Sequence, residues 1–484
     1  MNLASLSLFK NQAYIQGQWQ DALSGETIEV SNPADQAVIG TVPNMGKIEA
    51  TRAVDAAEAA LPEWRALSAK ARGRILKKWF DLMMEHQTEL ATILTVEQGK
   101  PLAEAKGEIA YGASYIEWYA EEAKRLYGDL IPAPRGDQKI MVQRQAIGVC
   151  AAITPWNFPN AMITRKIAPA LAAGCTIVLR PASQTPFSAL AIAALAEQAG
   201  VPAGVLNVIT GSSSEIGAVL TGDDRVKKFS FTGSTEVGKK LIAQCAETVK
   251  KVSMELGGNA PFIVFDDANL TEAVKAAIQS KFRNAGQTCV CANRIYVQSG
   301  IYDAFVEKFT QAVAELKVGN GLEDSEIGPL IDANAISKVK EHIADAQQHG
   351  AQVLVGGQPH ALGGLFFEPT VVAPATQSMK VAREETFGPL APIFPFETEA
   401  EAIAYANATE FGLASYFFTK DLGRAMRVAD ALEYGMVALN TGMLSNEAAP
   451  FGGVKHSGLG REGSKYGIED YLEMKYVVLG GLND

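Results

Sequence analysis

GVCAAITPWNFPNAMITRKIAPALAAGCTIVL, residues 148–179, is the stretch that decides the fold. Two short apolar runs, GVCAAIT (148–154) and CTIVL (175–179), stand at its ends with a helical stretch between them. Helix-like segments such as SALAIAALAEQAG (188–200) separate the apolar runs that follow, which are VLNVIT, KKFSF and KVSME. Strand-length runs that alternate with helical segments are typical of βαβ units. The sequence therefore predicts a parallel sheet that ends near residue 255.

The rest of the chain extends this pattern on both sides. A second series begins at APFIVF (260–265) and runs to about residue 440, whereas residues 47–127 have apolar residues at helical spacing. The stretch EDYLEMKYVVLGG (469–481) alternates apolar and polar residues, which predicts an edge strand that pairs outside its own domain. We expect an α/β fold with two Rossmann-like parallel-sheet domains and a small β arm. The expected division is 1–127 with 147–255, then 256–455, and 128–146 with 456–484.

Composition excludes several classes of protein. The net charge of −11 argues against non-specific binding to nucleic acid or to an anionic membrane. The N-terminus lacks a signal-peptide pattern, and the most apolar stretch, 167–179, is too short to cross a bilayer. Five cysteines among 484 residues are not a disulfide framework, and the five histidines do not join them at zinc spacing. We expect no metal site, and a cytoplasmic protein.

The motif FTGSTEVG (231–238) marks a change from strand to helix. We expect the helix to start at Ser234, where free N–H groups and the positive dipole end suit a pyrophosphate. Gly233 would let a ligand approach the backbone closely. The motif is not G-x-G-x-x-G, so a purely structural turn is the alternative.

Two further motifs present one polar side chain each. In TPWNFP (154–159), two prolines and a tryptophan surround Asn157, whose amide could hold an oxyanion or could only cap a stiff turn. In MELGGNAP (254–261), Glu255 ends a strand beside two glycines. Its carboxylate could be a mobile general base or a solvated strand end.

The motif GQTCVCANR (286–294) contains Cys289 and Cys291. A nucleophilic cysteine requires a lowered thiol pKa or a nearby base. The two sulfurs could also form a redox pair, or Cys291 could be a buried small residue. In REETFGP (383–389), a carboxylate followed by an aromatic ring could hold a sugar diol beside a flat nicotinamide, or the motif could be a charged turn.

These motifs, in this chain order, resemble the aldehyde dehydrogenase superfamily over essentially the whole chain. PFGGVKHSGLGREG (450–463) completes the matching set. The resemblance is closest to bacterial succinate-semialdehyde dehydrogenases, through stretches such as LTVEQGKPLAEAKGEI and SKFRNAGQTCVCANR. It implies that the first domain binds NAD(P), the second is catalytic, and the arm with the C-terminal segment serves oligomerisation.

The resemblance also implies a mechanism. Cys289 would attack the aldehyde and form a thioester, while Asn157 and the Cys289 N–H hold the oxyanion. Glu255 would activate the hydrolytic water, which favours a free acid as product. Lys166 would bind or relay protons near the site.

The cofactor residues carried over from the family include one departure. The family usually has lysine where this chain has Arg180, and strict NAD enzymes often have glutamate where it has Ser183. Arginine is a planar fork suited to phosphate, so this pair should tolerate or prefer NADP over NAD. The other implied cofactor contacts are Thr154, Trp156, Asn157, Gly233, Ser234, Leu256, Glu385 and Phe387.

The expectation that the substrate is negatively charged depends on Arg165 and Arg283, with Ser445 as a third residue. In succinate-semialdehyde dehydrogenases the matching positions grip the distal carboxylate, so the resemblance implies a short anionic aldehyde. Glutarate semialdehyde and a sulfonated aldehyde are alternatives, because one methylene changes discrimination by only about 1–3 kcal/mol. The family forms dimers or tetramers, so we expect a homodimer or homotetramer.

Two rivals belong to other classes. A non-catalytic binding protein of the same fold would be expected to lack Cys289 or Glu255, and both are present. A cysteine hydrolase needs a histidine partner, and no histidine lies within fifty residues of Cys289 in sequence. Spatial proximity leaves that rival open at this stage.

Overall fold

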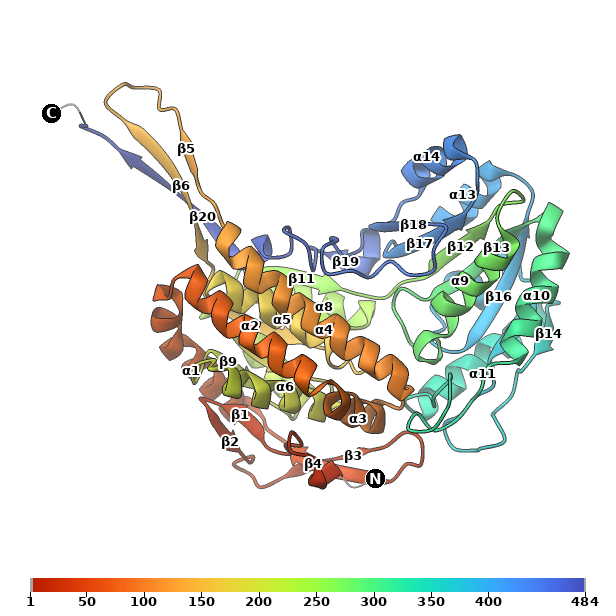
Figure 1. The fold of residues 1–484 in the computed structure, drawn as a ribbon, viewed down its shortest axis with the longest axis horizontal. Helices are drawn as coiled ribbons and strands as arrows, with labels where there is room; N and C mark the ends of the chain where they lie inside the picture. The colour runs from red at the N-terminus through yellow and green to blue at the C-terminus, as the bar shows by residue number, and fades with distance from the viewer. Residues whose placement is uncertain (1–2, 483–484) are drawn as a thin grey trace.

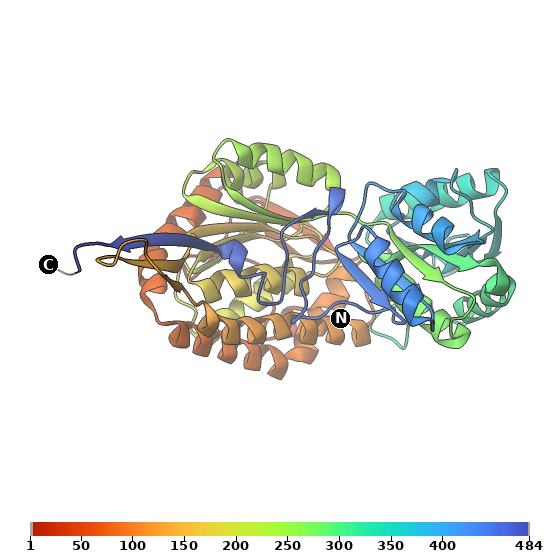
Figure 2. The ribbon, with the colours of Figure 1, turned by 90° about the horizontal axis from the view of Figure 1, so that it is seen from above.

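The computed structural model describes residues 3–482, so residues 1–2 of the expected segment 1–127 and residues 483–484 of the expected segment 456–484 lie outside the described residues. Two large sheets lie side by side, and a slender arm projects from the first of them (Figure 1). Figure 2 shows the arm extending away from the body on the side opposite the second sheet. The α/β class, with parallel-stranded sheets, is as predicted.

The first sheet has eight strands in the order β19-β11-β10-β7-β8-β9-β1-β2. Strands β7 to β11 pair in parallel, and antiparallel strands stand at both margins. Every residue of β7 and β8 is buried, as expected when helices cover both faces of a parallel sheet. The strands are β1 (Ala13–Ile15), β2 (Gln18–Gln20), β7 (Val149–Ile153), β8 (Thr176–Arg180), β9 (Leu206–Val208), β10 (Val226–Thr232), β11 (Lys251–Glu255) and β19 (Gly458–Leu459).

Helices surround this sheet, and the longest come from the region with helical periodicity. A separate hairpin of β3 (Thr27–Ser31) and β4 (Val38–Pro43) lies near the N-terminus. The helices of this part are α1 (Lys47–Ala66), α2 (Ala69–Glu85), α3 (Gln87–Gln98), α4 (Leu102–Glu122), α5 (Ala161–Ala173), α6 (Pro186–Ala199), α7 (Ser213–Gly222) and α8 (Thr235–Ala246).

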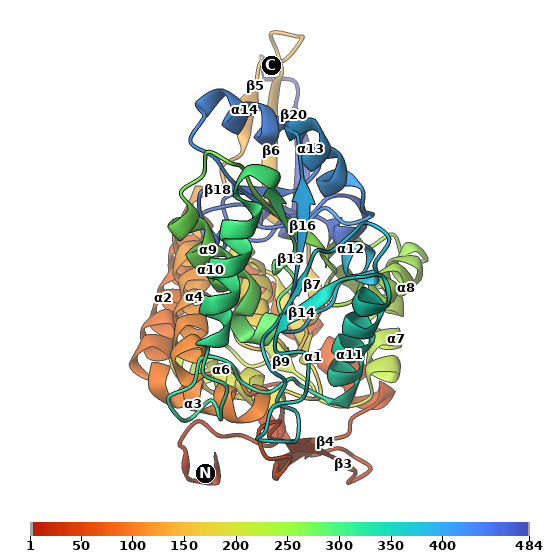
Figure 3. The same ribbon diagram turned by 90° about the vertical axis from the view of Figure 1, so that its right-hand side faces the viewer.

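The second sheet has seven strands in the order β14-β15-β16-β13-β12-β17-β18, and only β14 is antiparallel to its neighbour. Figure 3 shows α9 and α10 on one side of it and α11 and α12 on the other. Its strands are β12 (Ala260–Val264), β13 (Ala292–Gln298), β14 (Gln352–Val355), β15 (Thr370–Ala373), β16 (Leu390–Phe396), β17 (Ala414–Phe418) and β18 (Met436–Leu439). Its helices are α9 (Leu270–Phe282), α10 (Tyr302–Ala314), α11 (Ala333–Gln348), α12 (Lys380–Arg383), α13 (Glu399–Asn407) and α14 (Leu422–Ala431).

The arm is a three-stranded antiparallel sheet of β5 (Asp129–Ile131), β6 (Lys139–Ala146) and β20 (Leu472–Leu479). The expected edge strand is therefore β20, which pairs along all of β6. The segment from residue 456 is divided between two sheets, because β19 pairs with β11 of the first sheet before the chain reaches the arm. The positions of the domain boundaries stay a prediction.

Among residues 3–482, no helix is both long and apolar enough to cross a membrane.

Candidate active site

Two cavities meet at Cys289, which lines both of them. The first, of about 330 Å³, also contains the side chains of Arg165 and Arg283, and we call it the arginine cavity. The second, of about 240 Å³, contains Trp156, and we call it the tryptophan cavity. The cysteine that the sequence predicts as the nucleophile thus faces two chemically different spaces.

The loop that carries Cys289 is held in an unusual backbone conformation. Asn284 and Ala285 have φ values of 52° and 55°, and Gly286 has 74°. Left-handed backbone at non-glycine residues is uncommon and needs support from its surroundings. Here the Asn284 N–H donates to Glu104 Oε2 over 2.9 Å. The loop therefore leads from α9 to the nucleophile along one fixed path.

Burial decides the protonation state of Cys289. It raises the thiol pKa to about 12, although the charges of Arg165 and Arg283 lower it. The carboxylates of Glu385 and Glu255 act in the same direction as burial. The lowered thiol pKa that a nucleophile could use is absent here, so the thiol proton must pass to a base or to the aldehyde oxygen as the sulfur attacks.

Asn157 lies in the loop between β7 and α5, on the wall of the tryptophan cavity that Cys289 shares. Its Nδ2 donates to the Gln287 carbonyl over 3.0 Å, which ties it to the loop of Cys289. Its Oδ1 is buried and has no hydrogen-bond partner among the described residues. The amide is thus fixed beside the nucleophile and has one N–H of Nδ2 left to donate.

The arginine cavity holds two guanidinium groups in different environments. Arg165 is buried, with Nε 2.8 Å from Glu462 Oε2 and Cζ 3.8 Å from the centre of the Phe451 ring. Its Nη2 is buried without a hydrogen-bond partner among the described residues. Arg283 is half-buried, and no carboxylate of residues 3–482 lies within 4.0 Å of it. Ser445 lines the same cavity.

Glu255 and Lys166 are buried beside the two cavities and line neither of them. Lys166 Nζ is 2.5 Å from Glu462 Oε1. Burial, and then the charge of Glu462, raise the pKa of Glu255 well above its usual value. Burial alone would also raise the pKa of Glu462, but Lys166 and Arg165 lower it. Glu462 therefore carries the negative charge of this cluster.

The carboxylate of Glu255 lies close to Gly452. A Cβ at Gly452 would lie 2.9 Å from Glu255 Oε1, so only glycine leaves room for the carboxylate there. Neither oxygen of Glu255 has a hydrogen-bond partner among the described residues. A buried carboxyl group without hydrogen bonds is not anchored in place, which fits the expectation of a group with room to move.

The tryptophan cavity lies over the start of α8. Ser234 is the N-cap of this helix and accepts from the Val237 N–H, so the strand-to-helix turn is as predicted. Gly233 lines the cavity with Leu256. Free N–H groups at the first turn of α8 therefore face a space suited to an anion.

Glu385 and two aromatic rings form the opposite part of this cavity. The Trp156 and Phe387 rings are perpendicular, with centroids 5.7 Å apart. Phe387 has a φ of 54°, another left-handed residue in the site. Glu385 Oε1 accepts the Gly258 N–H over 3.2 Å, and burial raises the pKa of Glu385 to about 8.

The residues present fit a dinucleotide in this cavity. Thr232 Oγ1 is buried and has no partner among the described residues, although it lines the cavity. A Cβ at Gly257 would lie 3.0 Å from Glu385 Oε2 and 3.3 Å from Thr235 Oγ1, so the glycine keeps this wall open. An orphan hydroxyl, a helix N-terminus and a half-buried carboxyl group match a ligand with phosphates and sugar hydroxyls.

Arg180, Ser183 and Thr154 lie outside the lining of both cavities. Arg180 Nη2 donates to Ser183 Oγ over 2.8 Å and to the Gly211 carbonyl over 2.9 Å. No carboxylate among residues 3–482 pairs with this guanidinium, and burial lowers its pKa to about 10. The Thr154 hydroxyl is buried without a partner among the described residues.

Sequence reasoning missed several residues of the site. Glu462, which joins Arg165 to Lys166, stands in the LGREG stretch that had been quoted only as a family signature. A carboxylate within a glycine-rich run was the available signal. The apolar wall of the arginine cavity gave no pattern in the sequence, and it comes from Tyr111, Phe158, Met162, Val290, Met443 and Phe451.

Among residues 3–482, no group of three or more His, Cys, Asp or Glu side chains is placed to hold a metal ion. The five cysteines are free. Cys291 is buried, and its sulfur lies 3.3 Å from Lys281 Nζ. The redox pairing of Cys289 with Cys291 stays a hypothesis.

The chain is similar to known proteins over nearly its whole length. The family model described as "Aldehyde dehydrogenase family" matches residues 19–477. A glutarate-semialdehyde dehydrogenase of Pseudomonas aeruginosa is 64% identical, and the match covers 100% of both chains. A succinate-semialdehyde dehydrogenase of Escherichia coli, named with NADP(+), is 63% identical over 99% of this chain and 100% of its own. A 3-sulfolactaldehyde dehydrogenase of Pseudomonas putida is 63% identical over 100% of both.

Solved structures agree with this result. The crystal structure of an NADP-dependent enzyme of Escherichia coli has a TM-score of 0.98 and 63% sequence identity to this chain. It covers 98% of this chain and 100% of its own. The predicted α/β fold is thereby confirmed.

Proposed function

The chain belongs to the aldehyde dehydrogenase family, and from this premise we propose that it oxidises succinate semialdehyde to succinate with NAD(P)+ through a thioester on Cys289. The observation that carries the proposal is the position of Cys289. This sulfur lies where a cavity with two arginines meets a cavity that fits a dinucleotide. A substrate whose anionic end lies in the first cavity can therefore place its aldehyde carbon at Cys289. The hydride acceptor in the second cavity then lies within reach of the same carbon.

The first step is attack of Cys289 Sγ on the aldehyde carbon. The developing oxyanion would be held by Asn157 Nδ2 and the Cys289 N–H, which are the preorganised donors that such a step needs. Hydrogen bonding of Asn157 Nδ2 to the Gln287 carbonyl supports this role, because it places the donor against the loop of the nucleophile. When bound, the nicotinamide supplies the hydride acceptor. The carbon that has lost hydride remains on Cys289 as a thioester.

Glu255 would then take a proton from the water that hydrolyses the thioester. Its carboxyl group has no hydrogen bond to break before it moves, although it must turn from Gly452 toward Cys289. The raised pKa of Glu255 means that it accepts the water's proton readily once ionised. The bond between the acyl carbon and Cys289 Sγ then breaks, the sulfur leaves as a thiolate, and the proton on Glu255 returns to that thiolate or is relayed through the Lys166–Glu462 ion pair. The product is a free carboxylic acid.

The cofactor would lie in the tryptophan cavity and extend toward Arg180. Gly233 and Ser234 would face the pyrophosphate, and Thr154 and Leu256 would contact other parts of the cofactor. Glu385 would accept the nicotinamide ribose hydroxyls, next to the rings of Trp156 and Phe387. The structural support is the helix N-terminus at Ser234 and the half-buried carboxyl group of Glu385.

We further propose that NADP is accepted at least as well as NAD. Arg180 is a buried cation that pairs with no carboxylate of residues 3–482, and it already donates a hydrogen bond to Ser183. A 2′-phosphate would provide the missing negative charge, and Ser183 cannot repel it as a glutamate would. Relatives named with NADP(+) support the same choice.

The substrate's anionic end would be bound by Arg165 and Arg283, with help from Ser445. Charge-assisted bonds from two guanidinium groups select an anion and penalise a neutral chain. Glutarate semialdehyde and a sulfonated aldehyde such as 3-sulfolactaldehyde remain alternatives, because relatives with those names are 64% and 63% identical.

The test is steady-state formation of reduced nicotinamide, followed by absorbance, with the two cofactors in parallel. We expect activity with succinate semialdehyde and none for Cys289→Ala. A higher kcat/KM for glutarate semialdehyde or for the sulfonated aldehyde would identify that aldehyde as the substrate and would leave the proposed mechanism unchanged. No reduced nicotinamide from folded protein with any of the three aldehydes would favour a non-catalytic binding protein.

We also propose a homodimer or homotetramer that assembles through the arm and the C-terminal strand, in the cytoplasm. The arm supports this because its strands expose large apolar side chains. Five free cysteines suit a reducing compartment. The functional division would follow the sheets, with the cofactor on 1–127 and 147–255, catalysis on 256–455, and assembly on 128–146 and 456–484.

A further inference from the structure

Lys100 is a fully buried lysine in the turn between α3 and α4, and no role is given to it above. Its ammonium donates to Glu108 Oε2 over 2.5 Å and to the Asn157 carbonyl over 2.8 Å. It also lies 3.8 Å from the centre of the Phe158 ring. A buried charge is costly, and Lys100 directs its hydrogen bonds to the loop that carries Asn157.

Glu108, on α4, holds the other end of the same loop. Its Oε1 accepts the Asn160 N–H over 2.9 Å and the Ala161 N–H over 3.2 Å, at the start of α5. The lysine–glutamate pair therefore spans the loop from residue 157 to residue 161. Charge-assisted hydrogen bonds of this kind are about twice as strong as neutral ones.

A second chain of bonds reaches Asn157 from the side of Cys289. Gln98 Oε1 accepts the Lys100 N–H, and Gln98 Nε2 donates to Asn284 Oδ1, each over 3.0 Å. Asn284 Nδ2 donates to the Asn157 carbonyl over 3.0 Å and to the Gln287 carbonyl over 3.2 Å. The Gln287 carbonyl is the same group that accepts Asn157 Nδ2.

We propose that Lys100 and Glu108 are positioning residues that aim the Asn157 amide at the oxyanion. They fix the backbone of Asn157, while Gln98 and Asn284 fix it relative to the loop of Cys289. Preorganised donors accelerate acyl chemistry because they need no rearrangement as charge develops, and small displacements are expensive. The inference rests on the proposed role of Asn157.

The test is a double-mutant cycle with Asn157→Ala. The variant Lys100→Met/Glu108→Gln removes both members of the ion pair together, so neither Lys100 nor Glu108 is left as a buried charge without the other. We expect it to lower kcat/KM about 10- to 100-fold, since losing an oxyanion donor outright costs about 100- to 1,000-fold. In the Asn157→Ala background the same pair should cost about twofold or less, because the group that it positions is gone. Equal losses in both backgrounds would overturn the proposal.

A KM-against-kcat comparison separates positioning from general damage. The loss should fall on kcat, with the KM for NADP unchanged. Leu190→Ala, a fully buried substitution in α6 outside this network, controls for lost stability. If the double variant does not fold, Gln98→Leu enters the same cycle, with an expected loss of about 3- to 10-fold.

Hydrogen exchange tests the positioning without any substrate. Peptides that cover residues 155–162 should exchange at least about tenfold faster in Lys100→Met/Glu108→Gln than in the wild type or in Leu190→Ala. Unchanged protection there would contradict the proposal. If the wild type oxidised none of the aldehydes, the proposed function would fall, while this measurement would still decide whether the pair holds the loop.

Discussion

Cys289 combines two demands that act against each other. The site must exclude water to protect a thioester, yet burial opposes formation of the thiolate. Arg165 and Arg283 offset this in part, and they do so from the cavity where the substrate's anion would neutralise them. The free protein therefore keeps a protonated thiol, with a pKa of about 12.

Thiol alkylation should show this directly. The rate of iodoacetamide labelling at Cys289 should rise about tenfold per pH unit up to pH 10, because the thiolate fraction grows at that rate below the pKa. Cys289→Ser supplies the background from the four buried cysteines. A plateau below pH 8, measured by mass spectrometry of the labelled peptide, would mean a thiolate at neutral pH.

Arg283 offers the cleaner test of anion binding, because Arg165 is engaged with Glu462. Arg283→Met should lower kcat/KM for succinate semialdehyde about 10- to 100-fold, since a hydrogen bond to a charged group contributes about 1.5–3 kcal/mol. Arg283→Lys, which keeps the charge without the fork, should lose less. An equal loss of kcat/KM with a neutral aldehyde of the same length would show that Arg283 does not distinguish substrates by charge.

Sequence alone predicted some of the residues that line the cavities but not their charge states. Cys289, Asn157 and Glu385 stand in recognisable motifs, and all three line the tryptophan cavity. The raised thiol pKa and the pairing of Arg165 with Glu462 depend on burial and on contacts between segments about 300 residues apart. No local pattern carries that information.

At the scale of elements, the site forms where the parallel strands of the first sheet end. Asn157 follows β7, Gly233 follows β10, and Glu255 ends β11. Loops at the carboxyl ends of such strands are the usual place for ligands. The second sheet contributes loops instead, at residues 283–291 and 384–387. The βαβ pattern made the first set predictable, whereas the second set needed the relative position of the two sheets.

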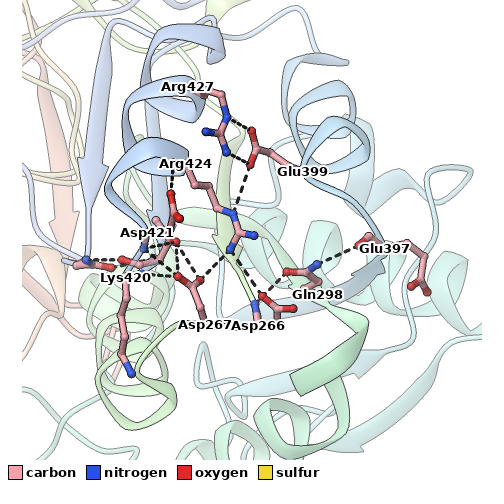
Figure 4. A network of polar contacts seen from close by, with 11 residues as sticks. Asp266, Asp267, Gln298, Glu397, Glu399, Lys420, Asp421, Arg424 and Arg427 are labelled. Atoms are coloured by element: carbon pink, nitrogen blue, oxygen red, sulfur yellow. Dashed lines mark hydrogen bonds and ion pairs between the residues drawn. The ribbon is translucent and has the colours of Figure 1, made fainter.

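A polar network away from the site joins segments at the carboxyl ends of the second sheet's strands (Figure 4). Arg424 Nη1 is 2.9 Å from Asp267 Oδ1, and its Nε is 3.4 Å from Glu399 Oε2. Its Cζ also lies 4.6 Å from the centre of the Phe265 ring. Asp267 follows β12, and Glu399 begins α13. Arg424, from α14, therefore joins three elements.

Substitution of Arg424 should affect stability and leave catalysis intact. Arg424→Met should lower the free energy of unfolding by about 1–3 kcal/mol, because it leaves Asp267 and Glu399 with fewer partners. Arg427→Met is the matched control: that side chain is 61% exposed, so the loss should be about 0.2–1 kcal/mol. Urea denaturation measures both. Equal losses would show that the network contributes only surface pairs.

For the whole molecule, the arm is the feature that a monomer does not explain. Leu130 is 77% exposed, Met474 75% and Tyr476 64%. These residues lie on β5 and β20, the two edge strands of the arm's sheet, and each of these strands has one edge that pairs with no other strand of residues 3–482. Exposed apolar strand edges favour association with another chain. The alternation of apolar and polar residues in 469–481 predicted β20. The pairing of β19 with the first sheet could not be predicted, because a strand of two residues is too short to show an alternating pattern.

Charge placed on the arm should therefore dissociate the assembly. We expect Met474→Asp/Tyr476→Asp to reduce the mass measured by light scattering to that of a smaller assembly or a monomer, because two carboxylates would be buried at the interface. Labelling of Cys289 should persist, since the arm lies away from the cavities. An unchanged mass for this variant would place the interface elsewhere.

We propose that this aldehyde dehydrogenase selects its substrate by charge, at the cavity that Cys289 lines together with two arginines. The most direct measurement is kcat/KM for succinate semialdehyde against butanal, a neutral aldehyde of equal carbon number, under the same conditions with NADP. Two charge-assisted contacts predict a preference of at least about 100-fold for the anionic aldehyde. Equal values for the two aldehydes would contradict the account.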